Sequence, residues 1–217
     1  MQPVICSIAR TPIGRFNGGL APLSAMDLGG VAITGALERA GLAGSDVDEV
    51  MFGHVLQAGQ GQITARQAAV RAGVPMTVPA VTINKVCLSG LTAIQEAANH
   101  VRLGESTFVV AGGMESMTNA PYVLPGAREG YRMGNKEVVD VMTHDGLFCA
   151  FDSCMMGESS DRKNDDLGIG RTEQDAWSAS SHARAAKATE DGTFAREIVS
   201  VPVPQRRGEP INVDSDE

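Results

Sequence analysis

Cys87 is the residue of this sequence best placed to act as a nucleophile. It follows a β-branched run over residues 80–86 and precedes residues 88–103, whose apolar spacing predicts a helix. A thiol at a helix N-terminus lies near backbone N–H donors and the positive end of the helix dipole, which favour its thiolate. The small residues Ser89 and Gly90 allow a backbone or an acyl group to approach closely. This order matches a nucleophile elbow with sulfur in place of oxygen, although a packed cysteine at a strand end would have the same spacing.

The other cysteines do not suggest chemistry of their own. Cys6, Cys149 and Cys154 form no C-x-x-C pair, and no histidine lies near the last two, so we expect no zinc site. Four scattered cysteines fit a reducing compartment better than a disulfide scaffold. We therefore expect these three to be free, buried side chains.

Phosphate-binding and histidine-based alternatives are weak. Gly59-Gln60-Gly61 lacks a third glycine at Thr64, no Gly-Lys-Ser/Thr occurs, and Gly112-Gly113 does not open a glycine fingerprint. The four histidines are interpreted as structural or solvated side chains: His54, His100, His144 and His182.

Length and composition indicate a small-molecule enzyme. The chain has 217 residues, 43% of them apolar and 20% charged, which is typical of a globular protein with a sizeable core. A net charge of −8 without a basic stripe makes it a poor nucleic-acid binder. No apolar run approaches the roughly 18 residues of a membrane helix, and the first six residues lack a basic signal-peptide region. We expect a cytoplasmic protein that binds neither nucleic acid nor membrane.

The elements that must position Cys87 alternate between strand and helix. The expected strands cover residues 4–9, 49–56, 80–86 and 107–111, and the expected helices run from Ser24 to Gly41, over residues 64–72 and over residues 88–103. Ser24 and Asp27 form a capping-box pattern at the first helix. This alternation predicts an α/β fold in which helices cover a largely parallel sheet.

The second half of the chain is less regular. We expect a long loop from Asn119 to Gly134, a helix capped by Thr172 and Asp175 that ends near Gly192, and a strand over residues 197–203. The last ten residues, 208–217, are turn-rich and acidic, and we expect no closing helix or strand there.

Several segments together resemble the thiolase family. Asn84-Lys85-Val86-Cys87-Leu88-Ser89-Gly90 is similar to its nucleophile motif, and Gly112-Gly113-Met114-Glu115-Ser116-Met117-Thr118-Asn119-Ala120-Pro121 is the most distinctive match. Further similarity is found in Ala9-Arg10-Thr11-Pro12-Ile13-Gly14-Arg15-Phe16, in residues 53–73, in Asp145-Gly146-Leu147 and in the segment from Ser181 to Ala185. The resemblance covers essentially the whole chain.

The resemblance implies a fold, a domain organisation and a reaction. Residues 1–113 would form the N-terminal α/β/α layered thiolase domain, and residues 114–217 an incomplete inserted loop domain, with the C-terminal thiolase domain absent from this chain. Thiolases interconvert two acyl-CoA molecules with a 3-oxoacyl-CoA and free CoA. Cys87 would be acylated, and its backbone N–H would form half of an oxyanion hole.

The resemblance also implies binding residues and partners. Leu147 and Met156 fall where the family lines its pantetheine channel, and the loop from Asn119 to Gly134 matches the family's tetramer-forming loop. Apart from its CoA substrates the enzyme would need no cofactor or metal.

Two departures from the family pattern qualify this expectation. Met155 replaces a histidine that in the family touches substrate, which favours a roomier acyl pocket, and residues 158–167 are unusually polar. The family's Gly-His-Pro and Cys-x-Gly-Gly-Gly motifs, which supply the general base and a second cysteine, do not occur in these 217 residues. The chain on its own would therefore lack the base that Claisen chemistry needs.

Three hypotheses remain open. The chain is the N-terminal part of an acetyl-CoA acetyltransferase-like thiolase, with an exposed apolar face and an unpaired sheet edge for the missing half. Alternatively, the enzyme is a broad- or long-chain 3-ketoacyl-CoA thiolase of fatty-acid degradation. A hypothesis of another class is a non-catalytic assembly or CoA-binding module.

Overall fold

A three-stranded parallel sheet forms the centre of the molecule. The computed structural model describes residues 2–217, and its main strands are β1 (Glu49–Gly53), β2 (Ala80–Ile83) and β3 (Val109–Gly113). Their order is β2-β1-β3, with Val50 of the central strand opposite Ala80 on one side and Val110 on the other. The α/β class with a parallel sheet is confirmed.

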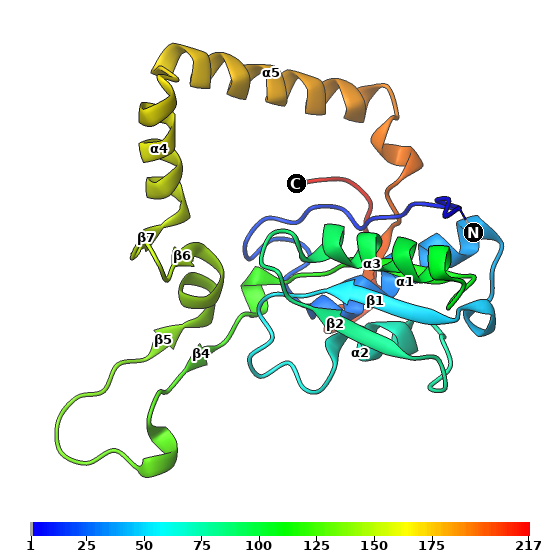
Figure 1. Ribbon diagram of the computed structural model, residues 1–217, viewed down its shortest axis with the longest axis horizontal. Coiled ribbons are helices and arrows are strands. Elements are labelled where there is room, and N and C mark those ends of the chain that lie inside the picture. Colours follow the sequence, from blue (N-terminus) through cyan, green and yellow to red (C-terminus); the bar gives the residue numbers. More distant parts are fainter. Residues whose placement is uncertain (1) are drawn as a thin grey trace.

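Helices cover both faces of this sheet (Figure 1). The chain moves from β1 to β2 through α2 (Thr64–Arg71), then back past β1 to β3 through α3 (Ser89–Leu103). Right-handed crossovers that step in opposite directions place their helices on opposite faces. α1 (Ala25–Ala40) packs beside α2 and completes one outer layer. The result is the predicted α/β/α arrangement.

The alternating side chains of β1 supply both halves of the core. Val50 and Phe52 are buried on the face covered by α1 and α2, together with Ile33 and Ala68. Met51 points to the other face. There it packs against Ala93 and Ala97 of α3, and the alanines let the helix lie close to the sheet.

The predicted boundaries of the first helix are confirmed. Ser24 Oγ accepts from the Asp27 N–H at 3.2 Å, and the Asp27 carboxylate accepts from the Ser24 N–H at 3.0 Å, which is a complete capping box. Gly41 ends the helix with a φ of 66°, in the left-handed conformation that glycine adopts at little cost.

The predicted N-terminal strand is wrong. Residues 4–9 form no strand, and Val4 and Ile5 are 79% and 77% exposed. A strand needs a hydrogen-bonded neighbour, and within residues 2–217 the nearest pairing is an isolated bridge between Arg10, just after this segment, and Ile198. β1 and β2 also end three residues earlier than expected, because the chain turns away from the sheet after Gly53 and Ile83.

The second half of the chain is drawn out into hairpins and two exposed helices. The hairpin strands are β4 (Tyr122–Val123) with β5 (Val139–Asp140) and β6 (Phe148–Cys149) with β7 (Cys154–Met155). A π-helical turn, Met142–Leu147, precedes β6. The helices are α4 (Met156–Leu167) and α5 (Arg171–Glu190), which stand apart from the sheet in Figure 1. Short 3-10 turns occur at Gly44–Asp46, Met117–Asn119, Ala127–Glu129 and Phe194–Arg196.

Two expectations for this half are corrected. α5 begins at Arg171, and its first turn is capped through Gly170, whose N–H donates to Glu173 Oε2 at 3.0 Å, rather than through Thr172 and Asp175. The end of the chain does hold a strand, because β9 (Ile211–Val213) pairs with β8 (Val201–Val203).

β8 and β9 return to the body of the molecule. Val201 and Val203 are buried against Leu20 and Leu23, which lie just before α1. The sequence analysis missed β9 because its residues are polar or largely exposed, and the strand depends on its pairing with β8. None of the helices within residues 2–217 is long and apolar enough to cross a membrane.

We expect Asp216→Asn to weaken the attachment of this C-terminal segment. Arg10 donates to the Asp216 oxygens at 2.6 and 3.0 Å and to Glu197 Oε1 at 2.6 Å. Chiefly because the Arg10 guanidinium donates hydrogen bonds to the Asp216 carboxylate, the pKa of Asp216 is lowered from its ordinary value of 3.8. The stabilisation is therefore present above that value and lost as the pH falls through the lower pKa of the folded chain.

Urea unfolding measured between about pH 7 and pH 2 tests this expectation. The variant should lose about 1 kcal/mol of unfolding free energy at neutral pH. Its stability should also fall less steeply than that of the wild type on the acid side. Identical pH profiles would show that the ion pair contributes nothing to stability.

Candidate active site

A strained turn presents Cys87 between β2 and α3. The preceding residue, Val86, has a φ of 50°, which is rare for a β-branched side chain and costs about 1–3 kcal/mol. Hydrogen bonds hold the turn in place: Ser89 Oγ donates to the Val86 carbonyl at 2.6 Å and accepts from the Lys85 N–H at 2.8 Å. The Val86 N–H donates to Asn84 Oδ1 at 3.0 Å. The predicted elbow is therefore present, with its strain located at Val86.

Glycines allow the elbow to sit directly on the sheet. A Cβ atom on Gly53 of β1 would lie 2.7 Å from the backbone nitrogen of Gly90, closer than real Cβ contacts permit. A Cβ atom on Gly113 of β3 would lie 3.5 Å from the Cα of Gly90. The close approach therefore depends most on the glycine at position 53, because a Cβ atom at position 90 would make only ordinary contacts, the nearest at 3.7 Å from the Gly112 carbonyl oxygen.

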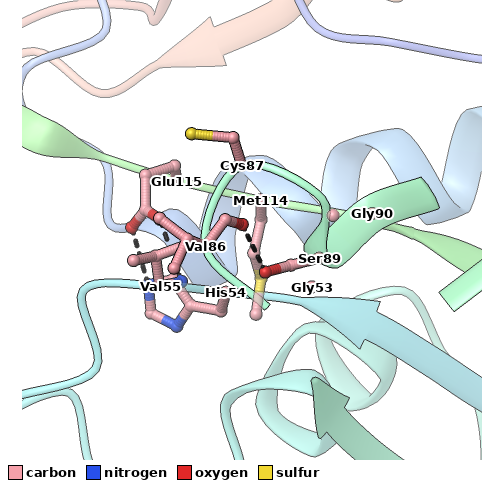
Figure 2. Close-up of a pocket in the computed structure, with 10 residues that line it drawn as sticks. Gly53, His54, Val55, Val86, Cys87, Ser89, Gly90, Met114 and Glu115 are labelled. Carbon is pink, nitrogen blue, oxygen red and sulfur yellow. Dashed lines mark hydrogen bonds and ion pairs between the residues drawn. The ribbon is translucent and has the colours of Figure 1, made fainter. Parts of the chain in front are cut away.

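The ends of the strands surround an open depression of about 370 Å³ (Figure 2). It is lined by residues that follow β1, residues of the elbow and residues that follow β3: Gly53, His54, Val55, Val86, Cys87, Ser89, Gly90, Gly113, Met114 and Glu115. Cys87 is exposed, and Figure 2 shows its sulfur pointing away from His54. Within residues 2–217 no hydrogen bond reaches this thiol, so it is open to a reactant.

A buried histidine and a carboxylate form the floor of the depression. His54 Nε2 lies 3.1 Å from Glu115 Oε1, and its Nδ1 lies 2.9 Å from the Thr64 hydroxyl. The Glu115 carboxylate also accepts from the Val55 N–H at 3.0 Å and from the Leu56 N–H at 3.4 Å. Both ring nitrogens of His54 are occupied. It is a structural histidine, as the sequence indicated, and ties the loop after β1 to the end of β3.

Comparison with known proteins gives a consistent result. A family model described as thiolase, N-terminal domain, matches residues 3–217. An acetyl-CoA acetyltransferase of Chromobacterium violaceum is 48% identical over the whole chain, and one of Pseudomonas aeruginosa is 49% identical over 99% of it. A probable acetyl-CoA acyltransferase of Staphylococcus aureus is 45% identical over the same share. The chain belongs to the thiolase family.

This thiolase chain spans about half the length of the curated relatives it matches. It covers 55% of the Chromobacterium violaceum protein and 54% of the other two. The match is with the N-terminal domain, as the sequence motifs indicated.

The residues expected to bind substrate lie together, but outside the depression at Cys87. Phe148 pairs with Met155 across the β6–β7 hairpin. Leu147 directly precedes this pair and Met156 directly follows it, so both lie at the end of the hairpin away from its loop. Leu147 is half-buried, and Met155 and Met156 are exposed. The thiolase chain therefore holds them at one end of a hairpin.

This hairpin is linked to the candidate site through Leu56. A Cβ atom on Gly146 would lie 3.3 Å from Leu56 Cδ2, so the turn before β6 packs against the loop that follows β1. The backbone of Leu56 is in turn bound by Glu115. A contiguous set of contacts thus runs from the floor of the depression to the hairpin.

The remaining histidines and cysteines lie elsewhere. His100 Nδ1 is 2.8 Å from Glu49 Oε2, and His144 Nδ1 is 2.6 Å from Asp145 Oδ1. Cys154 is buried and Cys149 half-buried, but Cys6 is exposed, contrary to expectation, because the segment that carries it pairs with no strand. No cluster of three or more potential metal ligands occurs within residues 2–217 of this thiolase chain.

Sequence reasoning missed Glu115 and its contact with His54. The signal was available, because parallel strands end at the same edge of a sheet and residues directly after them meet there. His54 directly follows β1, and Glu115 follows β3 by two residues. Their types alone did not indicate whether they would pair with each other or face the thiol.

We expect Glu115→Ala to destabilise this thiolase fold by about 2 kcal/mol, because it leaves a buried histidine nitrogen and two backbone N–H groups without their acceptor. Glu115→Gln keeps one acceptor oxygen and should lose less. Urea unfolding of both variants measures the difference. Equal stability of the Ala variant and the wild type would show that water replaces the carboxylate at no cost.

Proposed function

We propose that this chain is the nucleophile-bearing part of an acetyl-CoA acetyltransferase-like thiolase. The observation that carries the proposal is the exposed thiol of Cys87, held on a strained elbow at the N-terminus of α3 and open to an acyl donor. The names of the two bacterial acetyl-CoA acetyltransferases that it resembles support this reading. The left-handed conformation of Val86 costs free energy in the folded chain, and the hydrogen bonds of Ser89 stabilise the turn in spite of it. Strained residues that are held in this way cluster at functional sites.

The proposed reaction has two half-reactions at Cys87. In the first, the thiolate attacks the thioester carbonyl of acetyl-CoA, the acetyl group passes to sulfur, and CoA leaves. In the second, the α-carbon of another acetyl-CoA loses a proton and attacks the acyl-cysteine, which gives acetoacetyl-CoA and frees the thiol. The Cys87 N–H would bind the oxygen on which charge develops, a contribution of about 3 kcal/mol. The reverse sequence is thiolysis.

The proton at the α-carbon needs a base other than His54. Both nitrogens of His54 are bound within the floor of the depression. We therefore propose that the base comes from the C-terminal portion of the relatives' length, which this chain does not cover. On its own the chain should then be inactive in turnover.

Intact mass spectrometry tests the proposal. The experiment joins the 217-residue chain to the C-terminal portion of the Pseudomonas aeruginosa relative, confirms by gel filtration that the product is folded, and mixes it with acetyl-CoA. We expect a gain of one acetyl group, mapped to Cys87. A folded product that never acylates would support a non-catalytic assembly or CoA-binding module instead.

A longer-chain 3-ketoacyl-CoA thiolase of fatty-acid degradation is a second candidate. Met155 supports it, since this flexible apolar side chain lies opposite Phe148 where the resemblance places a polar histidine. The rate of acyl-enzyme formation from acyl-CoA thioesters of increasing length separates the two candidates. A rate that falls sharply beyond acetyl would favour the acetyltransferase.

Exposed apolar side chains support a further subunit or domain as a partner. Val4 and Ile5 of the N-terminal segment are exposed, as are Leu88 and Leu91 beside and on α3. We propose that the C-terminal thiolase half covers α3. We also propose that residues 1–113 form the catalytic domain and residues 114–217 the loop domain. The loop from Asn119 to Gly134 would then form contacts between the subunits of a homotetramer. Four free cysteines are consistent with a cytoplasmic location.

A further inference from the structure

Cys149 and Cys154 face each other across a hairpin that the proposed acyl transfer does not use for chemistry. β6 and β7 pair in the register Cys149↔Cys154, so the two residues are direct cross-strand neighbours, and both thiols are free. Directly opposed residues of antiparallel strands have Cα atoms about 4.5–5.5 Å apart. Disulfides span Cα separations of about 4.4–6.8 Å. The backbone therefore already has the spacing that a disulfide needs.

The loop between the two strands holds this register. The Ser153 N–H donates to the Cys149 carbonyl at 2.9 Å, and Ser153 itself has a φ of 51°. The Asp152 N–H donates to the Cys149 sulfur at 3.4 Å. These bonds close the loop from within, which keeps the two cysteines opposite each other in the folded chain.

The two sulfurs have different surroundings. Cys149 is half-buried, so a small reagent can reach it, while Cys154 is only 5% exposed. Arg162 of α4 donates a hydrogen bond to the Cys154 sulfur. A guanidinium at this position can pair with the thiolate, which is the form that attacks a disulfide. The geometry suits an attack on an outside disulfide by Cys149, followed by closure by Cys154.

We propose that Cys149 and Cys154 are a reversible dithiol–disulfide pair, oxidised by low-molecular-weight disulfides. The Cys149 thiolate attacks the small disulfide, forms a mixed disulfide and releases one small thiolate. The Cys154 thiolate then attacks the Cys149 sulfur and releases the second small thiolate. Two electrons pass to the small disulfide, and the two cysteine protons end on the two released thiols.

The proposed disulfide between Cys149 and Cys154 would constrain the hairpin that carries Met155 and leads into α4. Oxidation replaces the Arg162 hydrogen bond to the thiol by a covalent link between β6 and β7. Because α4 begins at Met156, directly after β7, the disulfide acts on the segment that joins this hairpin to the exposed helix.

Titration with mixtures of reduced and oxidised glutathione tests the proposal. The experiment uses the full 217-residue chain with Cys6→Ser and Cys87→Ser, which removes the two exposed thiols, under native conditions and in urea. Trypsin leaves both remaining cysteines on one peptide, residues 137–162, and a disulfide makes that peptide lighter by two hydrogen atoms. We expect an equilibrium constant for closure about tenfold or more higher in the native chain than in urea, because folding fixes the register.

Single variants separate the role of Cys149, which attacks the small disulfide, from the role of Cys154, which closes the protein disulfide. Cys154→Ser should keep glutathione on Cys149 as a lasting mixed disulfide, and Arg162→Gln should slow closure several-fold. A native equilibrium constant no higher than that in urea would overturn the proposal. Separate glutathione adducts on both cysteines of the native chain would also overturn it.

Discussion

We expect the replacement of Cys87 by serine to abolish the proposed acyl-enzyme formation, with a loss of about 10⁴-fold or more in the rate of acyl transfer. Serine preserves the size and position of the side chain on the elbow, and the surrounding hydrogen bonds come from Ser89 and Asn84 rather than from the thiol. The fold should therefore be unchanged. The loss follows from the chemistry alone, because a hydroxyl at neutral pH is a much weaker nucleophile than a thiolate.

The remaining cysteines provide matched controls for this experiment. Cys6 is exposed like Cys87, so Cys6→Ser tests whether any accessible thiol accepts acetyl. Mass spectrometry of the fusion with the Pseudomonas aeruginosa C-terminal portion should show full acetylation of the Cys6→Ser variant and none of the Cys87→Ser variant. Normal turnover by the Cys87→Ser variant would refute the assignment of the nucleophile.

The sequence predicted the central fold well because its signals are local. The capping pair Ser24 and Asp27, the glycine at position 41 and the alanine-rich faces of α2 and α3 each fix an element without help from distant residues. Cys87 was found in the same way, since a strand, a small-residue turn and a helix follow one another directly. The structure confirms these elements and the position of Cys87 on the turn between β2 and α3, while its role as the nucleophile stays a prediction.

The features that were missed depend on contacts between distant segments. The N-terminal segment has strand-like composition, but composition cannot supply a neighbouring strand, and Val4 stays exposed. β9 was missed for the opposite reason, because a polar segment becomes a strand when β8 pairs with it. The contact between His54 and Glu115 joins residues 61 positions apart (115 − 54), and only the register of the sheet brings them together.

A single methyl group added at Gly53 should destabilise the fold and displace Cys87. The Cβ atom of Gly53→Ala would lie 2.7 Å from the Gly90 nitrogen and equally close to the Ser89 backbone carbon, both at the start of α3. Backbone cannot rotate away as a flexible side chain can, so β1 and α3 must separate. We expect a loss of about 3 kcal/mol of unfolding free energy, which exceeds the roughly 0.4–1 kcal/mol gained when alanine stiffens the unfolded chain.

The effect on chemistry should be as clear as the effect on stability. Ser89 holds the elbow through Lys85 and Val86, so a shift of its backbone moves the thiol that they support. A displacement near 1 Å lowers a reaction rate by about 100-fold. Gly157→Ala is the matched control, since no atom lies within 4 Å of the Cβ position there. In helix α4 the added methyl group should leave stability unchanged or raise it by up to about 1 kcal/mol.

Urea unfolding of both variants, and acylation rates of both in the fusion with the Pseudomonas aeruginosa C-terminal portion, decide whether the close contact at Gly53 determines stability and the position of Cys87. If Gly53→Ala behaved like Gly157→Ala in both measurements, β1 and α3 could separate freely, and the position of Cys87 would not depend on their contact. We expect the opposite result, because the glycines at positions 53, 90 and 113 are the places where the sheet and the helix meet backbone to backbone. The reactivity of the thiol then rests on how closely α3 lies against the sheet.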